Sequence, residues 1–367
     1  MNTATAHEST PSTLTVSTTG SDLDRYRAIL EAKIQQARAH AAHVLEQIEQ
    51  DQPRDQIVRP SAVLFDPDRA AGVTVRVGED AYVPTDFALG QIASRAGIPI
   101  AYLRELTSPQ APTWQPHLAA HILRAHHEHA GGERVLVRSV RGQLRGWLSN
   151  RYRRLDSRPL VDALATEAAS IGALPVDAVA TETRVVLKLV LPRIFEPIPG
   201  ELLVYGGEWS NSDYGNGVHA FRPFALRVIC LNGMTRESAL KQVHLGTRLN
   251  DDLELSDRTR RLDTETSASI LRDVVRTTFE RGPDALTRAI RAAHERPMTA
   301  TQLERGTRPL AKNVQKSIVE AFESKDVLNL PPGNTAWRAS NAISWIARNT
   351  DNPEHRMDLE MAAGALV

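Results

Sequence analysis

The sequence contains one cysteine, Cys230, among its 367 residues. A lone cysteine excludes intrachain disulfides and every zinc or iron–sulfur site that needs several cysteine ligands, and it is typical of the reducing cytoplasm, where we place this protein. Long apolar runs are missing, and the first twenty residues lack the basic start and apolar centre of a signal peptide. We therefore expect no membrane partner.

A net charge is missing as well. Lysine and arginine together number 44, as do aspartate and glutamate, while hydrophobic residues make up 41% of the chain. This apolar fraction is enough for a normal buried core, so we expect a globular protein. Because the formal charges cancel, the molecule as a whole has no electrostatic field that would steer it to nucleic acid. Any affinity for a polyanion must come from a local surface.

The usual catalytic motifs are also absent, including the nucleophile elbow, the phosphate-binding loop, the dinucleotide fingerprint and the zinc-protease motif. His117 and His121 are spaced to share one helical face, but no glutamate follows His117 as in that protease motif. We assign no catalytic residue, no metal and no cofactor. Asp213, with His219 and His244 near it in sequence, is a weaker alternative that suggests a nuclease or hydrolase.

The periodicity of apolar residues predicts an α+β fold, with a central antiparallel β-sheet flanked by helices and an N-terminal helical arm. The arm either packs on its own domain or forms a coiled coil with another subunit, which leaves a homo-oligomer open. The predicted regions are a disordered Ser/Thr-rich tail (1–20), an amphipathic helix (21–55), a mostly helical subdomain (60–132), a β-rich core (133–250) and a helical C-terminal region packing on that core (251–367).

The stretch "ERVLVRSVRGQLRGWLS" predicts a β-hairpin that turns at Gly142. Strict alternation would place Leu144 and Leu148 on one face and Arg145 and Trp147 on the other. The same alternation in "TETRVVLKLVLP" points basic side chains outward from a strand. The segment "PFALRVICLNG" suits either a strand or a short helix. We favour the helix, because its proline and its last glycine occupy the favoured first and C′ positions.

Positive charge is concentrated between residues 133 and 158, which include eight arginines and two acids. Two aromatic rings interrupt this run, and cations beside exposed rings are what a protein that binds single-stranded nucleic acid requires. The alternative is that the rings are core anchors and the arginines pair with carboxylates. The predicted nucleic-acid-binding residues are Arg141, Arg145, Trp147, Arg151, Tyr152, Arg153, Arg154 and Lys188. A polar loop that can lie over a ligand contains Asn211, Asp213 and Tyr214.

Three separated motifs carry a family resemblance. They are "RYRRLDSRPL", then "SDYGNGVHAFRPFALRVICLNGM" with "HLGTRL" after it, and "TAWRASNAISWIARNTDNPEHRMDLEMAAGALV". Together they resemble the phage/plasmid-like protein family known as domain of unknown function 932, from about Pro84 to the end. The resemblance implies an accessory protein of phages, plasmids or their hosts, a setting in which DNA recombination and repair are frequent. The family has no assigned activity.

These observations predict an accessory protein that binds nucleic acid, most directly single-stranded DNA, through a basic and aromatic surface. Single-strand annealing proteins also pack a basic hairpin sheet on helices, which is an architectural analogy only. A different hypothesis is an oligomerising protein-interaction factor or a modulator of host machinery, served by the amphipathic helices. A third is an unrecognised nuclease or hydrolase.

Overall fold

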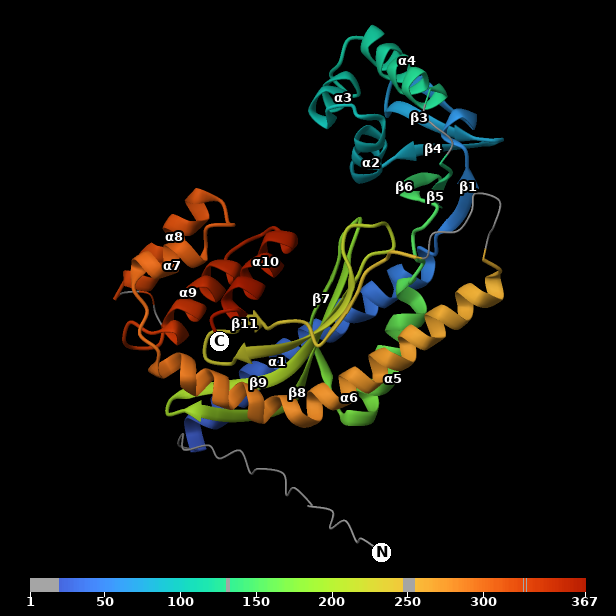
Figure 1. Ribbon diagram of the computed structural model, residues 1–367. Coiled ribbons are helices and arrows are strands. Elements are labelled where there is room, and N and C mark those ends of the chain that lie inside the picture. The colour runs from blue at the N-terminus through green and yellow to red at the C-terminus, as the bar shows by residue number, and fades with distance from the viewer. Residues whose placement is uncertain (1–19, 130–132, 247–254, 326, 328) are drawn as a thin grey trace, which may run out of the picture.

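The computed structural model describes residues 20–129, 133–246, 255–325, 327 and 329–367. The predicted tail, residues 1–20, lies outside these ranges except for Gly20. Within them the fold is α+β, with two sheets that are mainly antiparallel, an N-terminal helix and helices around the second sheet (Figure 1). Each helix in these ranges is too short or too polar to traverse a lipid bilayer.

The first sheet and three helices form one end of the molecule, which we term the first unit (Figure 1). Its elements are β1 (Arg54–Val58), a 3₁₀ turn (Pro60–Ala62), β2 (Val63–Asp68), β3 (Gly72–Val77), β4 (Asp80–Pro84), α2 (Asp86–Ala96), α3 (Ile100–Leu106), α4 (Trp114–Glu128), β5 (Val135–Val140) and β6 (Gln143–Ser149). The strand order is β1-β5-β6-β4-β3-β2, and only β4 and β6 pair in parallel among these neighbours. Valines of β3 and leucines of α3 and α4 form its core.

The second unit is an antiparallel sheet between helices, and it contains the rest of the described chain. Its strands are β7 (Leu174–Ala180), β8 (Val185–Ile198), β9 (Glu201–Asn211), β10 (His219–Arg227), β11 (Asn232–Thr235) and β12 (Leu240–Gln242). Its helices are α1 (Gly20–Gln50), α5 (Ser157–Ile171), α6 (Asp257–Glu295), α7 (Ala300–Gly306), α8 (Lys312–Glu323), α9 (Ala336–Arg348) and α10 (Pro353–Gly364). Strand order is β11-β10-β9-β8-β7, and β12 pairs with β10.

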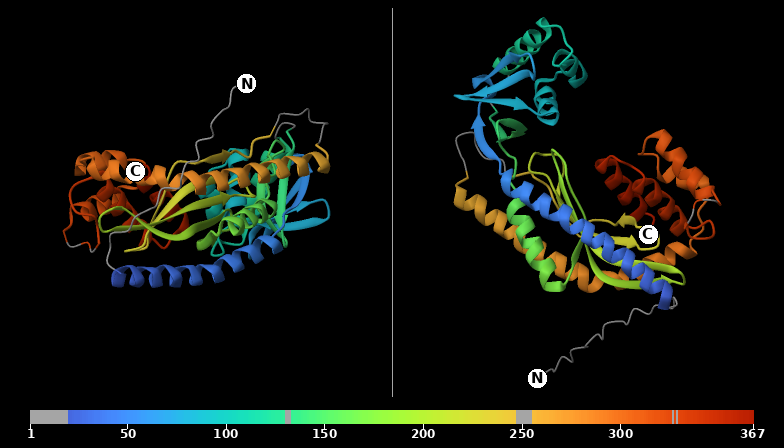
Figure 2. Two further views of the ribbon diagram at one scale, coloured as in Figure 1. Left: turned by 90° about the horizontal axis from the view of Figure 1, so that it is seen from below. Right: turned by 180° about the vertical axis from the view of Figure 1, so that it is seen from behind.

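Helices cover both faces of this second sheet (Figure 2). Leu30 and Ile34 of α1 pack on one face, against Val190 and neighbouring residues. Phe279 of α6 packs on the other, where its ring meets Tyr205 edge-on at a centroid distance of 5.9 Å. The apolar stripe of α1 is therefore buried within its own chain, which is the first of the two readings predicted for it.

The predicted hairpin is present, but its faces differ from strict alternation. Arg141 and Gly142 both have positive φ, 48° and 78°, and form the tight turn between β5 and β6. In the strand register Ser139 faces Leu144 while Arg138 faces Gly146, so Arg145 is the extra residue of a β-bulge. The bulge reverses the alternation and places Trp147 on the core face.

The region 60–132 contains α2, α3 and α4, and it also contains β2, β3 and β4, which form half of the first sheet. Two other predictions about elements are wrong. The region 133–250 is not one core, because β5 and β6 belong to the first sheet and β7 to β12 to the second; residues 247–250 lie outside the described ranges. Residues 223–233 form strand and turn rather than helix, since pairing with β9 outweighs the proline and glycine signals.

Candidate functional site

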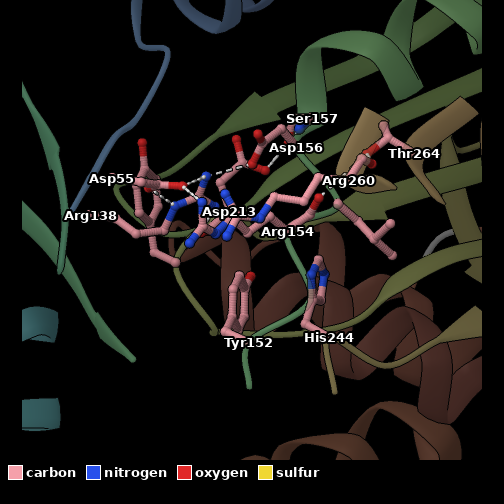
Figure 3. Close-up of polar contacts among 12 residues, drawn as sticks. Asp55, Arg138, Tyr152, Arg154, Asp156, Ser157, Asp213, His244, Arg260 and Thr264 are labelled. Carbon is pink, nitrogen blue, oxygen red and sulfur yellow. Dashed lines mark hydrogen bonds and ion pairs between the residues drawn. The ribbon is translucent and has the colours of Figure 1, made fainter. Parts of the chain in front are cut away.

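The two units meet at a buried arginine, Arg138 of β5, whose side chain is 1% exposed (Figure 3). Its Nε donates to Asp55 Oδ1 at 2.8 Å, its Nη2 to Asp156 Oδ1 at 2.6 Å and its Nη1 to the carbonyl of Asp213 at 2.7 Å. Burial alone would lower the pKa of Arg138, but Asp156 and Asp55 outweigh it and raise the pKa. Arg138 is therefore a fixed cation that joins β1, the start of α5 and the loop after β9.

The polar loop after β9 is hydrogen-bonded to the first residue of α5. Asp213 Oδ1 accepts hydrogen bonds from the backbone N–H of Ser157 at 2.9 Å, from its hydroxyl at 2.7 Å and from Asn211 Nδ2 at 3.0 Å. Burial, with the charge of Asp156 beside it, raises the pKa of Asp213 to about 6. Tyr214 is buried nearby, and a cavity of about 220 Å³ adjoins all three predicted loop residues.

The predicted catalytic triplet is not assembled. Asn211 lies between Asp213 and His244. Its Oδ1 is 3.1 Å from Nε2 of His244, and its Nδ2 donates a hydrogen bond to Asp213. His244 Nδ1 lies 3.0 Å from the carbonyl of Arg153, and burial lowers its pKa. His219 bonds Gln242 instead, and burial lowers its pKa to about 4. No hydrogen bond joins any two of the three residues.

Carboxylates near the end of α1 neutralise much of the predicted basic run. Asp51 pairs with Arg145 at 3.0 Å and with Arg141 at 3.3 Å, and Glu49 pairs with Arg158. The alternative predicted from sequence, that these arginines pair with carboxylates, holds for this part of the run.

Four other arginines of the run, together with Arg260 of α6, surround one cavity of about 460 Å³, which we call the arginine cavity. It is lined by the five arginines Arg134, Arg151, Arg153, Arg154 and Arg260, and its other walls include Ile57, Tyr152, Leu245, Leu255 and Asp263. Arg134 directly precedes β5, three of the arginines lie in the loop after β6, and Arg260 lies in the first turn of α6. Segments far apart in sequence thus bring positive charge to one concave surface.

Five arginines line the cavity beside one carboxylate, Asp263. Arg153 makes a two-point contact with Asp263, both distances being 2.7 Å, and Arg154 pairs with Asp55 at 3.2 Å. Burial lowers the pKa of Arg154, and the nearby positive charge of Arg260 lowers it further. The negative charge of Asp55 acts in the other direction and raises the pKa, but it does not outweigh them. Like-charge crowding of this kind favours an anionic ligand.

Two further cavity arginines, Arg260 and Arg151, have exposed partners. Arg260 pairs with Asp257, whose side chain is 99% exposed, and Arg151 lies 3.5 Å from Glu133, which is 58% exposed. Ion pairs this open to solvent contribute little, about 0–1 kcal/mol. Both guanidinium groups can therefore exchange their partner for a phosphate at small cost.

Two residues of the predicted nucleic-acid surface are buried and do not line the arginine cavity. Trp147, 3% exposed, packs in the first core with its ring centroid 6.3 Å from that of Phe65. Lys188, 2% exposed, is covered by α10 and pairs with Glu360. The outward direction predicted for Lys188 is wrong because both faces of β8 are covered.

Tyr152 forms a wall of the arginine cavity, but its ring already stacks on His244 at 5.1 Å and 3°. Arg260 was missed by the sequence analysis because it lies more than a hundred residues from the basic run. Only the fold brings it there, and no local pattern in "DRTRRLD" distinguishes it from Arg261.

Comparison with known proteins identifies no relative of this chain. No model of a protein family, no curated protein and no solved structure matches this chain. Among the described residues, no three His, Cys, Asp or Glu side chains gather as a metal site would require. The resemblance to the phage/plasmid-like family, carried by the three motifs, stays a prediction.

Proposed function

We propose that this protein binds single-stranded nucleic acid, DNA in the first instance, and that the arginine cavity holds its phosphates. The observation that carries the proposal is the five arginines around one cavity of about 460 Å³. A guanidinium group is planar and donates to a phosphate through two parallel N–H groups, which makes arginine the side chain best suited to this contact.

The concave shape favours a single strand over a duplex. A flexible strand can turn one phosphate at a time into the cavity, whereas a stiff duplex keeps its phosphates on a convex surface. Leu245 and Leu255 adjoin the cavity and are 69% and 46% exposed, so they offer apolar surface to a sugar or base. They replace Trp147, which burial removes from the predicted surface.

Matched variants on α6 test the proposal. Arg260→Ala removes a cavity arginine, while Arg261→Ala removes its neighbour, which is 70% exposed and pairs with Glu265 outside the cavity. We expect Arg260→Ala to weaken binding of labelled oligothymidine and to reduce the salt dependence by about 0.7 slope units, the value for one lost single-strand phosphate contact. Arg261→Ala should bind like the parent.

Fluorescence anisotropy at several salt concentrations gives both quantities. Equal binding by the two variants, or a parent that binds no oligonucleotide at low salt, contradicts the proposal. A parent that prefers duplex contradicts the strand preference. The wider role, an accessory protein of mobile elements working in the cytoplasm, rests on the three sequence motifs and on the lone cysteine.

A further inference from the structure

A second concave surface adjoins the arginine cavity. It is a groove of about 510 Å³ along α2, which we call the α2 groove, and its lining includes Phe87, Arg95, Arg104 and Ser149. Ser149 is followed directly by Asn150, which lines the arginine cavity. Consecutive residues at the end of β6 thus line the two surfaces.

One carboxylate stands at this border. Glu133 Oε2 lies 3.5 Å from Nη2 of Arg95 in the groove, and its Oε1 lies 3.5 Å from Nη2 of Arg151 in the cavity. The glutamate is 58% exposed, and the two arginines are 28% and 33% exposed. A single anion thus bridges two cations that belong to neighbouring concave surfaces.

From this geometry we infer that the arginine cavity and the α2 groove form one track for a nucleic-acid strand, and that Glu133 occupies the track until a phosphate displaces it. The inference rests on the proposed function and names its substrate as a strand of several nucleotides rather than a mononucleotide. A phosphodiester carries one negative charge, so it can replace the carboxylate between the two guanidinium groups without changing the local charge.

The exchange costs little and the groove offers contacts beyond it. Both ion pairs of Glu133 are long and exposed, and such pairs contribute little to stability. Phe87 is partly buried in the groove wall and gives a base a ring to lie against. Arg104 lies farther along, where it is held by two hydrogen bonds to Asp86 at 2.7 and 2.5 Å.

A variant of Glu133 tests the track separately from the proposed function, because removing this carboxylate should strengthen binding rather than weaken it. Glu133→Gln keeps the size of the side chain and removes the competing charge, so we expect roughly two- to five-fold tighter binding of an oligothymidine of about twelve nucleotides, which is long enough to fill the track. The matched control is Glu323→Gln at the exposed end of α8, which changes the net charge equally. The control should leave the affinity unchanged.

A length series gives the second readout. We expect the affinity of the parent to rise from thymidine dinucleotide to oligomers of about eight and then level off, as for a strand that fills a track. Arg95→Ala should weaken the long oligomers several-fold and leave the dinucleotide unaffected, since the cavity alone holds it. Thermal unfolding confirms that each variant is folded.

Each result decides one of the two claims. Tighter binding by Glu133→Gln together with length-dependent loss in Arg95→Ala supports the track. Unchanged or weaker binding by Glu133→Gln, or a dinucleotide bound as tightly as the long oligomer, overturns the track while leaving the arginine cavity as a nucleic-acid site. A parent that binds no oligomer of any length overturns both.

Discussion

Arg138 Nη2 lies 2.6 Å from Asp156 Oδ1, and this contact joins the sheet of the first unit to the start of α5 in the second. The same guanidinium group also bonds Asp55 and the carbonyl of Asp213, so every nitrogen of the group is engaged. The loop that carries three of the cavity arginines lies between β6 and α5. The position of the arginine cavity therefore depends on Arg138.

Replacing this cation should destabilise the protein strongly. Arg138→Met keeps much of the apolar volume but leaves Asp55 and Asp156 without their shared partner. Removing one member of a buried ion pair costs about 3–5 kcal/mol, and we expect the lower end because Asp156 is 39% exposed. Urea unfolding measures the free energy, and a loss below 1 kcal/mol would show that the carboxylates find other partners.

Trp147 should act as a core residue rather than as a binding residue. Its ring lies among Phe65 and His127 of the first core, so Trp147→Ala leaves a cavity and should cost about 3–5 kcal/mol of unfolding free energy. Trp147→Phe should cost less and bind oligothymidine like the parent. Weak binding by a fully folded Trp147→Phe would contradict the buried position. Chemical unfolding and anisotropy on the same samples separate the two effects.

Local patterns predicted the elements better than their faces. The hairpin turn at Gly142 follows from a residue type that acts locally, because glycine adopts the positive φ that a tight turn requires. The bulge at Arg145 does not, because it depends on pairing with Arg138 across the sheet. One inserted residue was enough to reverse the predicted face of Trp147.

The candidate site was predicted only in part, for the same reason. The arginines of the loop after β6 were visible as a cluster in the sequence, whereas Glu49, Asp51 and Asp55, which neutralise part of the run, come from a segment about ninety residues earlier. A count of charges within the basic run does not include these three carboxylates. Lys188 was misplaced because its partner Glu360 is on a helix near the C-terminus.

Asp213 should make stability fall as the pH rises. Its pKa rises from an ordinary value of 3.8 to about 6, chiefly through burial and then through Asp156, while Arg138 and the two donors of Ser157 oppose the rise. Between these values the folded protein holds a proton that the unfolded chain has released, so this contribution to the unfolding free energy decreases with pH, by about 1.4 kcal/mol per unit at most. It is fully present below pH 3.8.

Asp213→Asn removes this titration and keeps an oxygen for the bonds from Ser157. Relative to the parent, the unfolding free energy of the variant should therefore increase between pH 4 and pH 6. Urea unfolding at half-unit intervals of pH measures the difference. A difference that is flat across this window would contradict the raised pKa.

The contribution of His219 to the unfolding free energy should depend on pH in the opposite direction. Burial lowers its pKa from 6.5 to about 4, opposed by the bond to Gln242 and aided by the positive charges of Arg153 and of His244 when protonated. The unfolded chain takes up the proton first, so stability is present above pH 6.5 and is lost as the pH falls towards 4. His219→Gln should lose this acid sensitivity, which urea unfolding at pH 5 and pH 7 measures. Equal sensitivity in parent and variant would contradict it.

Arg153 and Asp263 offer a pair of variants whose effects on binding differ in sign. The two side chains make a two-point ion pair at 2.7 Å between the loop after β6 and α6, so losing either partner should lower the stability, by about 1 kcal/mol because Asp263 is 42% exposed. Arg153→Ala also removes a cation from the arginine cavity and should weaken oligothymidine binding and its salt dependence. Asp263→Asn removes an acid from the cavity wall and frees Arg153, so it should bind more tightly than the parent. Urea unfolding and anisotropy test both variants, and a loss of binding in Asp263→Asn equal to that in Arg153→Ala would mean that the pair acts only by holding the loop to α6.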